Sequence, residues 1–84
     1  MDKDLVYPFM GKLSLVYLKL PMTTMTVYGI IKSLGPGNYI ILEKPKNINE
    51  VNMVQGTSIV PLENILFITQ ISEEDIPKNE NTQG

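Results

Sequence analysis

Cysteine, histidine, tryptophan and arginine are all absent from this chain of 84 residues. Without cysteine it can form no disulfide, no iron–sulfur cluster and no thiolate zinc site. A metal would have to be held by carboxylates alone, and the Asp and Glu residues do not follow the loop spacing that such a site requires. We therefore expect no metal and no cofactor. The length allows one domain with a thin core, so self-assembly is the remaining route to added stability.

The absence of arginine limits how the chain could recognise nucleic acid, because all seven basic residues are lysine. A lysine cannot form the paired hydrogen bonds by which a guanidinium group binds phosphate or guanine. The net charge of −2 is also far from the basic profile of a typical nucleic-acid domain. Residues 1–46, however, hold six lysines against three carboxylates, whereas residues 47–84 hold one lysine against six. This division allows one modestly basic face and an acidic C-terminal part.

Long hydrophobic runs are missing as well. The uninterrupted apolar runs are only a few residues long, as in residues 65–68. No membrane helix fits this pattern. Residues 1–4 are mixed in charge and no apolar signal core follows them, which argues against export. We therefore expect a cytoplasmic protein that does not enter a membrane.

Side chains suited to catalysis are equally scarce. No cysteine or histidine is present to act as nucleophile or base, and the serines have no evident activating partner. The adjacent Glu73 and Glu74 fall in a polar tail that cannot hold the geometry of a general acid and base. We expect neither enzymatic activity nor a small-molecule substrate.

Apolar residues make up 43% of the chain, and their alternation with period two is typical of β-strands. Turn-forming residues bound these stretches, as in the tight turn Gly35-Pro36-Gly37-Asn38. Gly29 lies inside a β-branched stretch, where glycine marks a bend or a bulge. The pattern predicts an all-β fold, a small five-stranded antiparallel barrel or sandwich. The expected strands lie near residues 12–20, 25–34, 39–44, 58–61 and 65–71.

The two ends of the chain have a different composition. Residues 1–10 form an N-terminal segment in which Lys3 to Tyr7 could make a short helical turn that Pro8 ends. Residues 11–71 contain the β domain. Residues 72–84 are acidic and polar, and we expect them to be disordered and dispensable for assembly.

The order of these elements resembles the Sm-like protein superfamily, which includes the bacterial host-factor-Q branch and small bacteriophage proteins. Three successive stretches are similar to the first Sm motif. They carry Gly11, Val16, Leu18 and Lys19, then Val27, Gly29, Ile31 and Leu34, and then Ile40, Leu42 and Glu43. Residues 59–68, Ile-Val-Pro-Leu-Glu-Asn-Ile-Leu-Phe-Ile, resemble the second motif. The resemblance implies a strongly bent barrel with a glycine at the bend of its second strand.

The ligand-binding positions of the family have diverged more than the barrel-forming ones. Gly35 stands where the family has an aspartate, and Gly37 stands where it has a base-stacking aromatic residue. The family asparagine falls at Tyr39, with Asn38 one residue early, so a shifted turn is one reading. Leu62-Glu63-Asn64 replaces the pore-facing Arg-Gly or Lys-His. The candidate RNA-binding residues are Lys32, Asn38, Tyr39, Glu63 and Asn64.

Each of these candidates also has a purely structural interpretation. Tyr39 could stack on a base or pack in the sheet, and Asn38 could bind RNA or only supply a left-handed turn. Glu63 and Asn64 could line a pore or form a turn at the barrel rim. The lysines could follow a nucleic-acid backbone or protect the sheet edges from aggregation.

The resemblance further implies a cyclic homo-oligomer of five to seven subunits, because edge strands left bare are an aggregation hazard that pairing between subunits removes. The candidate interface residues are Val60, Ile65, Phe67 and Ile68. Two functions remain open at this point. The ring could bind single-stranded RNA rich in uridine or adenine, or it could be a scaffold that has kept the fold and lost the ligand site.

Overall fold

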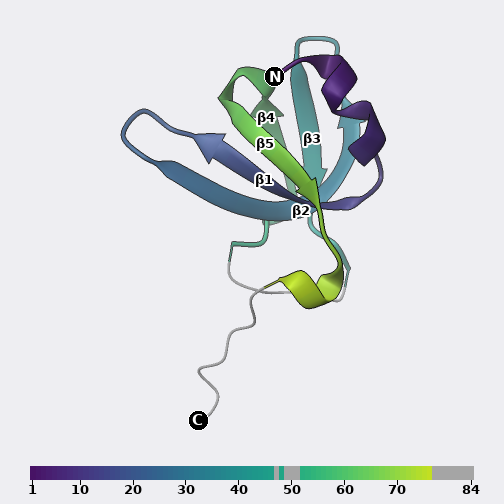
Figure 1. The fold of residues 1–84 in the computed structure, drawn as a ribbon. Coiled ribbons are helices and arrows are strands. Elements are labelled where there is room, and N and C mark those ends of the chain that lie inside the picture. Colours follow the sequence, from purple (N-terminus) through teal and green to yellow (C-terminus); the bar gives the residue numbers. More distant parts are fainter. Residues whose placement is uncertain (47, 49–51, 77–84) are drawn as a thin grey trace.

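Five antiparallel strands form one sheet in the computed structural model, which describes residues 1–46, 48 and 52–76 (Figure 1). The strand order is β4-β3-β2-β1-β5. All five predicted strands are confirmed, and no strand end differs from the prediction by more than one residue. They are β1 (Leu13–Lys19), β2 (Thr24–Leu34), β3 (Tyr39–Glu43), β4 (Thr57–Pro61) and β5 (Ile65–Gln70).

The long strand β2 connects the two halves of the sheet. Its residues 24–30 pair with β1 and its residues 30–34 pair with β3, with a register shift between Ile31 and Ser33. Gly29 is buried just before this shift. A Cβ atom at Gly29 would lie 2.8 Å from Cγ1 of Val54 and 3.3 Å from the carbonyl oxygen of Glu43. Glycine is therefore needed here because neighbouring atoms approach the backbone closely.

Among the described residues, the sheet does not close into a hydrogen-bonded barrel, because β4 and β5 lie at its two edges and are not paired with each other. A 3-10 turn of three residues, η3 (Leu62–Asn64), joins these two edge strands. Apolar side chains from both of them nevertheless meet over one face of the sheet, where Val60 and Ile65 share a cluster with Ile40. The connection is short enough to hold the two edges over a common core.

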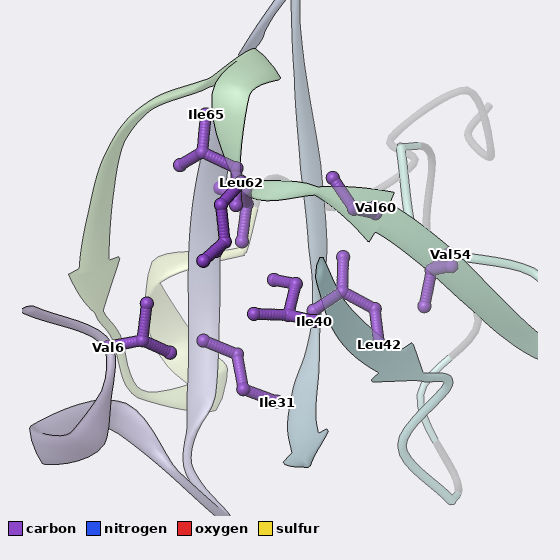
Figure 2. Packing of buried hydrophobic residues seen from close by; sticks show 9 residues of the cluster. Val6, Ile31, Ile40, Leu42, Val54, Val60, Leu62 and Ile65 are labelled. Atoms are coloured by element: carbon purple, nitrogen blue, oxygen red, sulfur yellow. The ribbon is translucent and has the colours of Figure 1, made fainter. Parts of the chain in front are cut away.

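That core is a single cluster on one face of the sheet (Figure 2). Its fully buried members include Val16 on β1, Ile31 on β2, and Ile40 and Leu42 on β3, all 0% exposed. They share one face because side chains alternate along each strand. The remaining buried members are Val6, Val54, Val60, Leu62 and Ile65.

The N-terminal segment covers part of this core with two short turns, η1 (Lys3–Leu5) and η2 (Tyr7–Phe9). Val6, between them, is 0% exposed. The short helical turn expected near residue 3 is thus present. Pro8 does not end the helical region as expected but lies inside η2, since proline is tolerated in the first turn of a helix, where its missing N–H has no partner to lose.

A second apolar cluster lies on the opposite face, formed by Tyr28 on β2, Met53 and Ile76. The backbone N–H of Tyr28 donates to the carbonyl oxygen of Asn52 at 2.9 Å, and the N–H of Val54 donates to the carbonyl oxygen of Tyr28 at 2.9 Å. These bonds form a parallel bridge between Tyr28 and Met53, so residues 52–54 lie alongside β2, with the Met53 side chain in this cluster and the Val54 side chain in the first one. The outer face is therefore covered at this point rather than exposed to solvent.

Residues 72–76 differ from the disordered tail that the sequence predicts. The turn η4 (Glu73–Asp75) begins with a capping box, in which the Ser72 N–H donates to Oδ2 of Asp75 at 2.9 Å. Ile76 follows and is 1% exposed in the cluster with Tyr28 and Met53. One apolar side chain at the end of a polar stretch is enough to dock it. Residues 77–84, the rest of the predicted tail, lie outside the described residues.

Candidate functional site

A groove of about 540 Å³ lies where the β2–β3 turn, η3 and the N-terminal residues meet. The register of β3 and β4, in which Tyr39 pairs with Pro61, places the two turns side by side. The backbone N–H of Leu62 donates to the carbonyl oxygen of Asn38 at 2.9 Å and joins them directly. The lining residues are Met1, Asp2, Lys3, Asp4, Gly37, Asn38, Pro61, Leu62 and Glu63.

Asn38 lines this groove in a left-handed conformation, with φ of 63°. Asparagine is one of the few residues with a side chain that adopts this conformation readily. The backbone role expected for Asn38 is therefore confirmed, and the exposed amide remains free to face the groove within the described part of the chain. RNA binding by the side chain of Asn38 stays a prediction, which the backbone role does not oppose because it uses different atoms.

The ring of Tyr39 lies so close to Gly35 that a Cβ atom added there would overlap the ring carbon Cζ. The N–H of Gly35 also donates to the carbonyl oxygen of Tyr39 at 2.8 Å, which closes the turn. Tyr39 is half-buried and packs on the glycine that stands at the family's aspartate position. The glycine at residue 35 and the tyrosine at residue 39 therefore fit together sterically.

Glu63 lines the groove from η3, whereas its neighbour Asn64 has a structural role. Nδ2 of Asn64 donates to the carbonyl oxygen of Lys19 at 3.0 Å and so ties η3 to the end of β1. Lys32 lies elsewhere, with its Nζ 3.6 Å from Oε1 of Glu43 at the far end of β3. Of the five candidate residues, the structure brings Asn38 and Glu63 into one groove and places Tyr39 beside them.

The groove lining carries three carboxylates, Asp2, Asp4 and Glu63, against two cations, Lys3 and the N-terminal ammonium of Met1, which donates to the carbonyl oxygen of Leu62 at 3.2 Å. Within the described ranges, no three Asp, Glu, Cys or His side chains are grouped so that they could hold a metal ion. The N-terminal contribution to this groove was not foreseen from the sequence, because nothing in residues 1–4 indicates which turn they will contact.

The predicted interface residues divide into two groups. Val60 and Ile65 are 8% and 5% exposed and belong to the core of their own subunit, and Ile68 packs against the same core. Phe67 is 47% exposed and its ring stacks on Tyr17 at a centroid distance of 4.9 Å. The edge strands instead expose Ile59 and Leu66, at 66% and 48%. Counting alternate positions from the buried Val60 would have identified Ile59 from the sequence.

None of the helices in the described residues is long and apolar enough to span a membrane. Comparison with known proteins finds no matching family model, no matching curated protein and no matching solved structure. The interpretation of the groove consequently depends on its own geometry and on the motif resemblance.

Proposed function

We propose that this chain is an Sm-like subunit that assembles into a cyclic ring of five to seven copies and binds single-stranded RNA in the cytoplasm, without catalysis. One observation carries the proposal. The two turns at which the family places its ligand, residues 35–38 and 62–64, meet at one groove lined by Asn38 and Glu63. The strand order and the long β2 that pairs on both sides fit a strongly bent Sm-like barrel.

Ring assembly is supported by the state of the sheet edges. β4 and β5 each have a strand partner on one side only within the part of the chain that the structure describes. Such edges are usually blocked in a monomer to prevent aggregation. Here they carry the exposed apolar residues Ile59, Leu66 and Phe67. Pairing β4 of one copy with β5 of the next is a head-to-tail contact, which closes into a ring when the rotation fits.

Replacing Ile59 with lysine should therefore dissociate the ring. A charge in the centre of an apolar contact must be desolvated without a partner, which is costly. The matched control is Met22→Lys in the β1–β2 turn, because Met22 is 93% exposed and lies off both edges. Sedimentation velocity at tens of micromolar should show an oligomer for the unchanged protein and for Met22→Lys, and a smaller species for Ile59→Lys. A clean monomer for the unchanged protein would contradict the proposal.

RNA binding should depend on the amide of Asn38. Asn38→Gly removes the side chain while glycine keeps the left-handed backbone at no steric cost. Asn52→Gly is the matched control, because Asn52 has φ of 71° and lies outside the groove. Fluorescence anisotropy with short oligo-U and oligo-A should show binding weakened about tenfold by Asn38→Gly, which corresponds to roughly 1.4 kcal/mol of binding free energy. The control should bind as the unchanged protein does.

A scaffold ring without RNA is the second candidate, and the acidic lining of the groove favours it. Three carboxylates against Lys3 and the N-terminal ammonium leave a net negative charge, which disfavours the approach of a phosphate backbone. The same anisotropy titration separates the two functions. An intact ring that binds neither oligomer at low salt would end the RNA proposal and leave the scaffold.

A further inference from the structure

A second groove, of about 520 Å³, lies at the opposite end of β3 from the Asn38 groove. β3 runs from Tyr39, next to the first groove, to Glu43, which lines the second. The two grooves are thus separated by about 13 Å along the strand, at roughly 3.3 Å per residue. Figure 1 shows the arrowhead of β3 at the end of the sheet away from the N-terminus. The lining residues are Ile30, Glu43, Lys44, Pro45, Lys46, Gly56 and Thr57.

The backbone forms a firm base for this groove. The last pair of the β3–β4 ladder joins Glu43 to Thr57, and beyond it the N–H of Lys44 donates to the carbonyl oxygen of Gly56 at 2.8 Å. Gly56 has φ of 73°, and apart from its two chain neighbours no atom of the described residues lies within 4 Å of where its Cβ would be. The space over this glycine is therefore open to an incoming ligand.

Apolar and cationic groups are arranged together in the groove. Pro45 is buried and Ile30 is half-buried, and they supply an apolar surface. Lys46 is exposed and Lys44 is half-buried on the same lining. Lysines along a groove attract a phosphate backbone, and the apolar patch beside them offers contact to a sugar or a base.

The local charge is the reverse of that in the first groove. Glu43 is the one carboxylate among the described lining residues, against Lys44 and Lys46. Lys32 lies beside Glu43, with 3.6 Å between Nζ and Oε1, and both side chains are well exposed at 62% and 42%. Exposed ion pairs are weak, so Lys32 can turn toward a phosphate at little cost. Three lysines are thus available to an anion at this end of the subunit.

We infer that this second groove binds the phosphodiester backbone of single-stranded nucleic acid, with Lys44 and Lys46 on phosphates and the Ile30–Pro45 surface under a sugar or base. The inference rests on the proposed RNA-binding function and assigns its phosphate contacts to the end of the subunit away from the acidic Asn38 groove. Repetition around a ring multiplies the two lysines per subunit into a band of positive charge. The volume falls within the range of roughly 300–1,000 Å³ that is usual for ligand sites.

The test compares the double variant Lys44→Gln/Lys46→Gln with Lys12→Gln/Lys19→Gln. Both variants lose two exposed or half-buried lysines and the same net charge, but only the first alters the groove. Anisotropy with oligo-U and oligo-A is measured across a salt series. For the groove variant, the slope of log affinity against log salt should become shallower by about 0.7 for each phosphate that a lysine no longer neutralises. The control should keep the slope of the unchanged protein.

A variant expected to bind more tightly completes the test, because a gain in binding cannot result from misfolding. Thr57→Lys places a further cation on the lining of the groove, and Thr23→Lys places the same cation in the exposed β1–β2 turn. The first should tighten binding at low salt and steepen the salt slope, and the second should change neither. Equal effects of the two substitutions would overturn the inference.

The outcomes separate this inference from the proposed function. If Asn38→Gly weakens RNA binding while both lysine double variants behave alike, the inference about the second groove is wrong and the proposed RNA site in the Asn38 groove is supported. If only the Lys44/Lys46 variant weakens RNA binding, the inference about the second groove is supported and the Asn38 groove is not the RNA site. An unchanged protein that binds neither oligomer overturns both.

Discussion

Leu42→Ala is expected to lower the free energy of unfolding by about 2–5 kcal/mol, the usual cost of a buried leucine truncation. Leu42 is 0% exposed and lies in the middle of the core, opposite Ile31 in the β2–β3 ladder. Its removal leaves a cavity between β3 and the chain segments packed over it, because the surrounding strands are held by their hydrogen bonds and cannot collapse fully. Since small domains have stabilities of about 5–15 kcal/mol, this loss is a large share of the total.

The matched control is Leu5→Ala, since Leu5 is 59% exposed on η1. An exposed truncation of this kind should change stability by no more than about 0.5 kcal/mol. Urea unfolding followed by circular dichroism measures both variants. All samples must have the same protein concentration, because assembly adds stability that depends on concentration. Similar losses for both leucines would mean that the core is not where the structure places it.

Ile76→Ala should destabilise the domain by about 2–4 kcal/mol, although Ile76 belongs to a stretch whose composition predicts disorder. Its side chain is 1% exposed and packs with Tyr28 and Met53 on the outer face of the sheet. The loss should also free the segment that follows β5, because the capping box of Ser72 and Asp75 is exposed and holds only a single turn. Thermal unfolding and hydrogen exchange at Tyr28 and Val54 measure the two effects.

Ile76→Leu is the control for this site. It keeps the apolar volume, and such exchanges usually cost less than about 1.5 kcal/mol. If alanine and leucine at residue 76 are equally well tolerated, the side chain is not buried in solution. The expectation from composition, that residues 72–84 are dispensable, would then hold for residues 72–76 as well.

The five strands and the turn at residues 35–38 could be predicted because alternation of apolar residues and turn chemistry are properties of short segments. The candidate groove was half predictable. Asn38 and Glu63 were both named from motif positions, and the β3–β4 register then brings their turns together. The residues that complete the groove, Met1 to Asp4, carry no local signal of where they will dock.

The sequence by itself determined the strand bounds, the turns and the scarcity of catalytic groups, since each follows from residue type and spacing. Only the tertiary structure decided which residues share a surface. It packed Tyr39 on Gly35, buried Ile76 against Tyr28, and gathered Lys44 and Lys46 around an apolar surface. The contact between Ile76 and Tyr28 joins positions far apart in the chain, and all three arrangements depend on how the sheet curves and on which segments cover its two faces. No local spacing of residues carries that information.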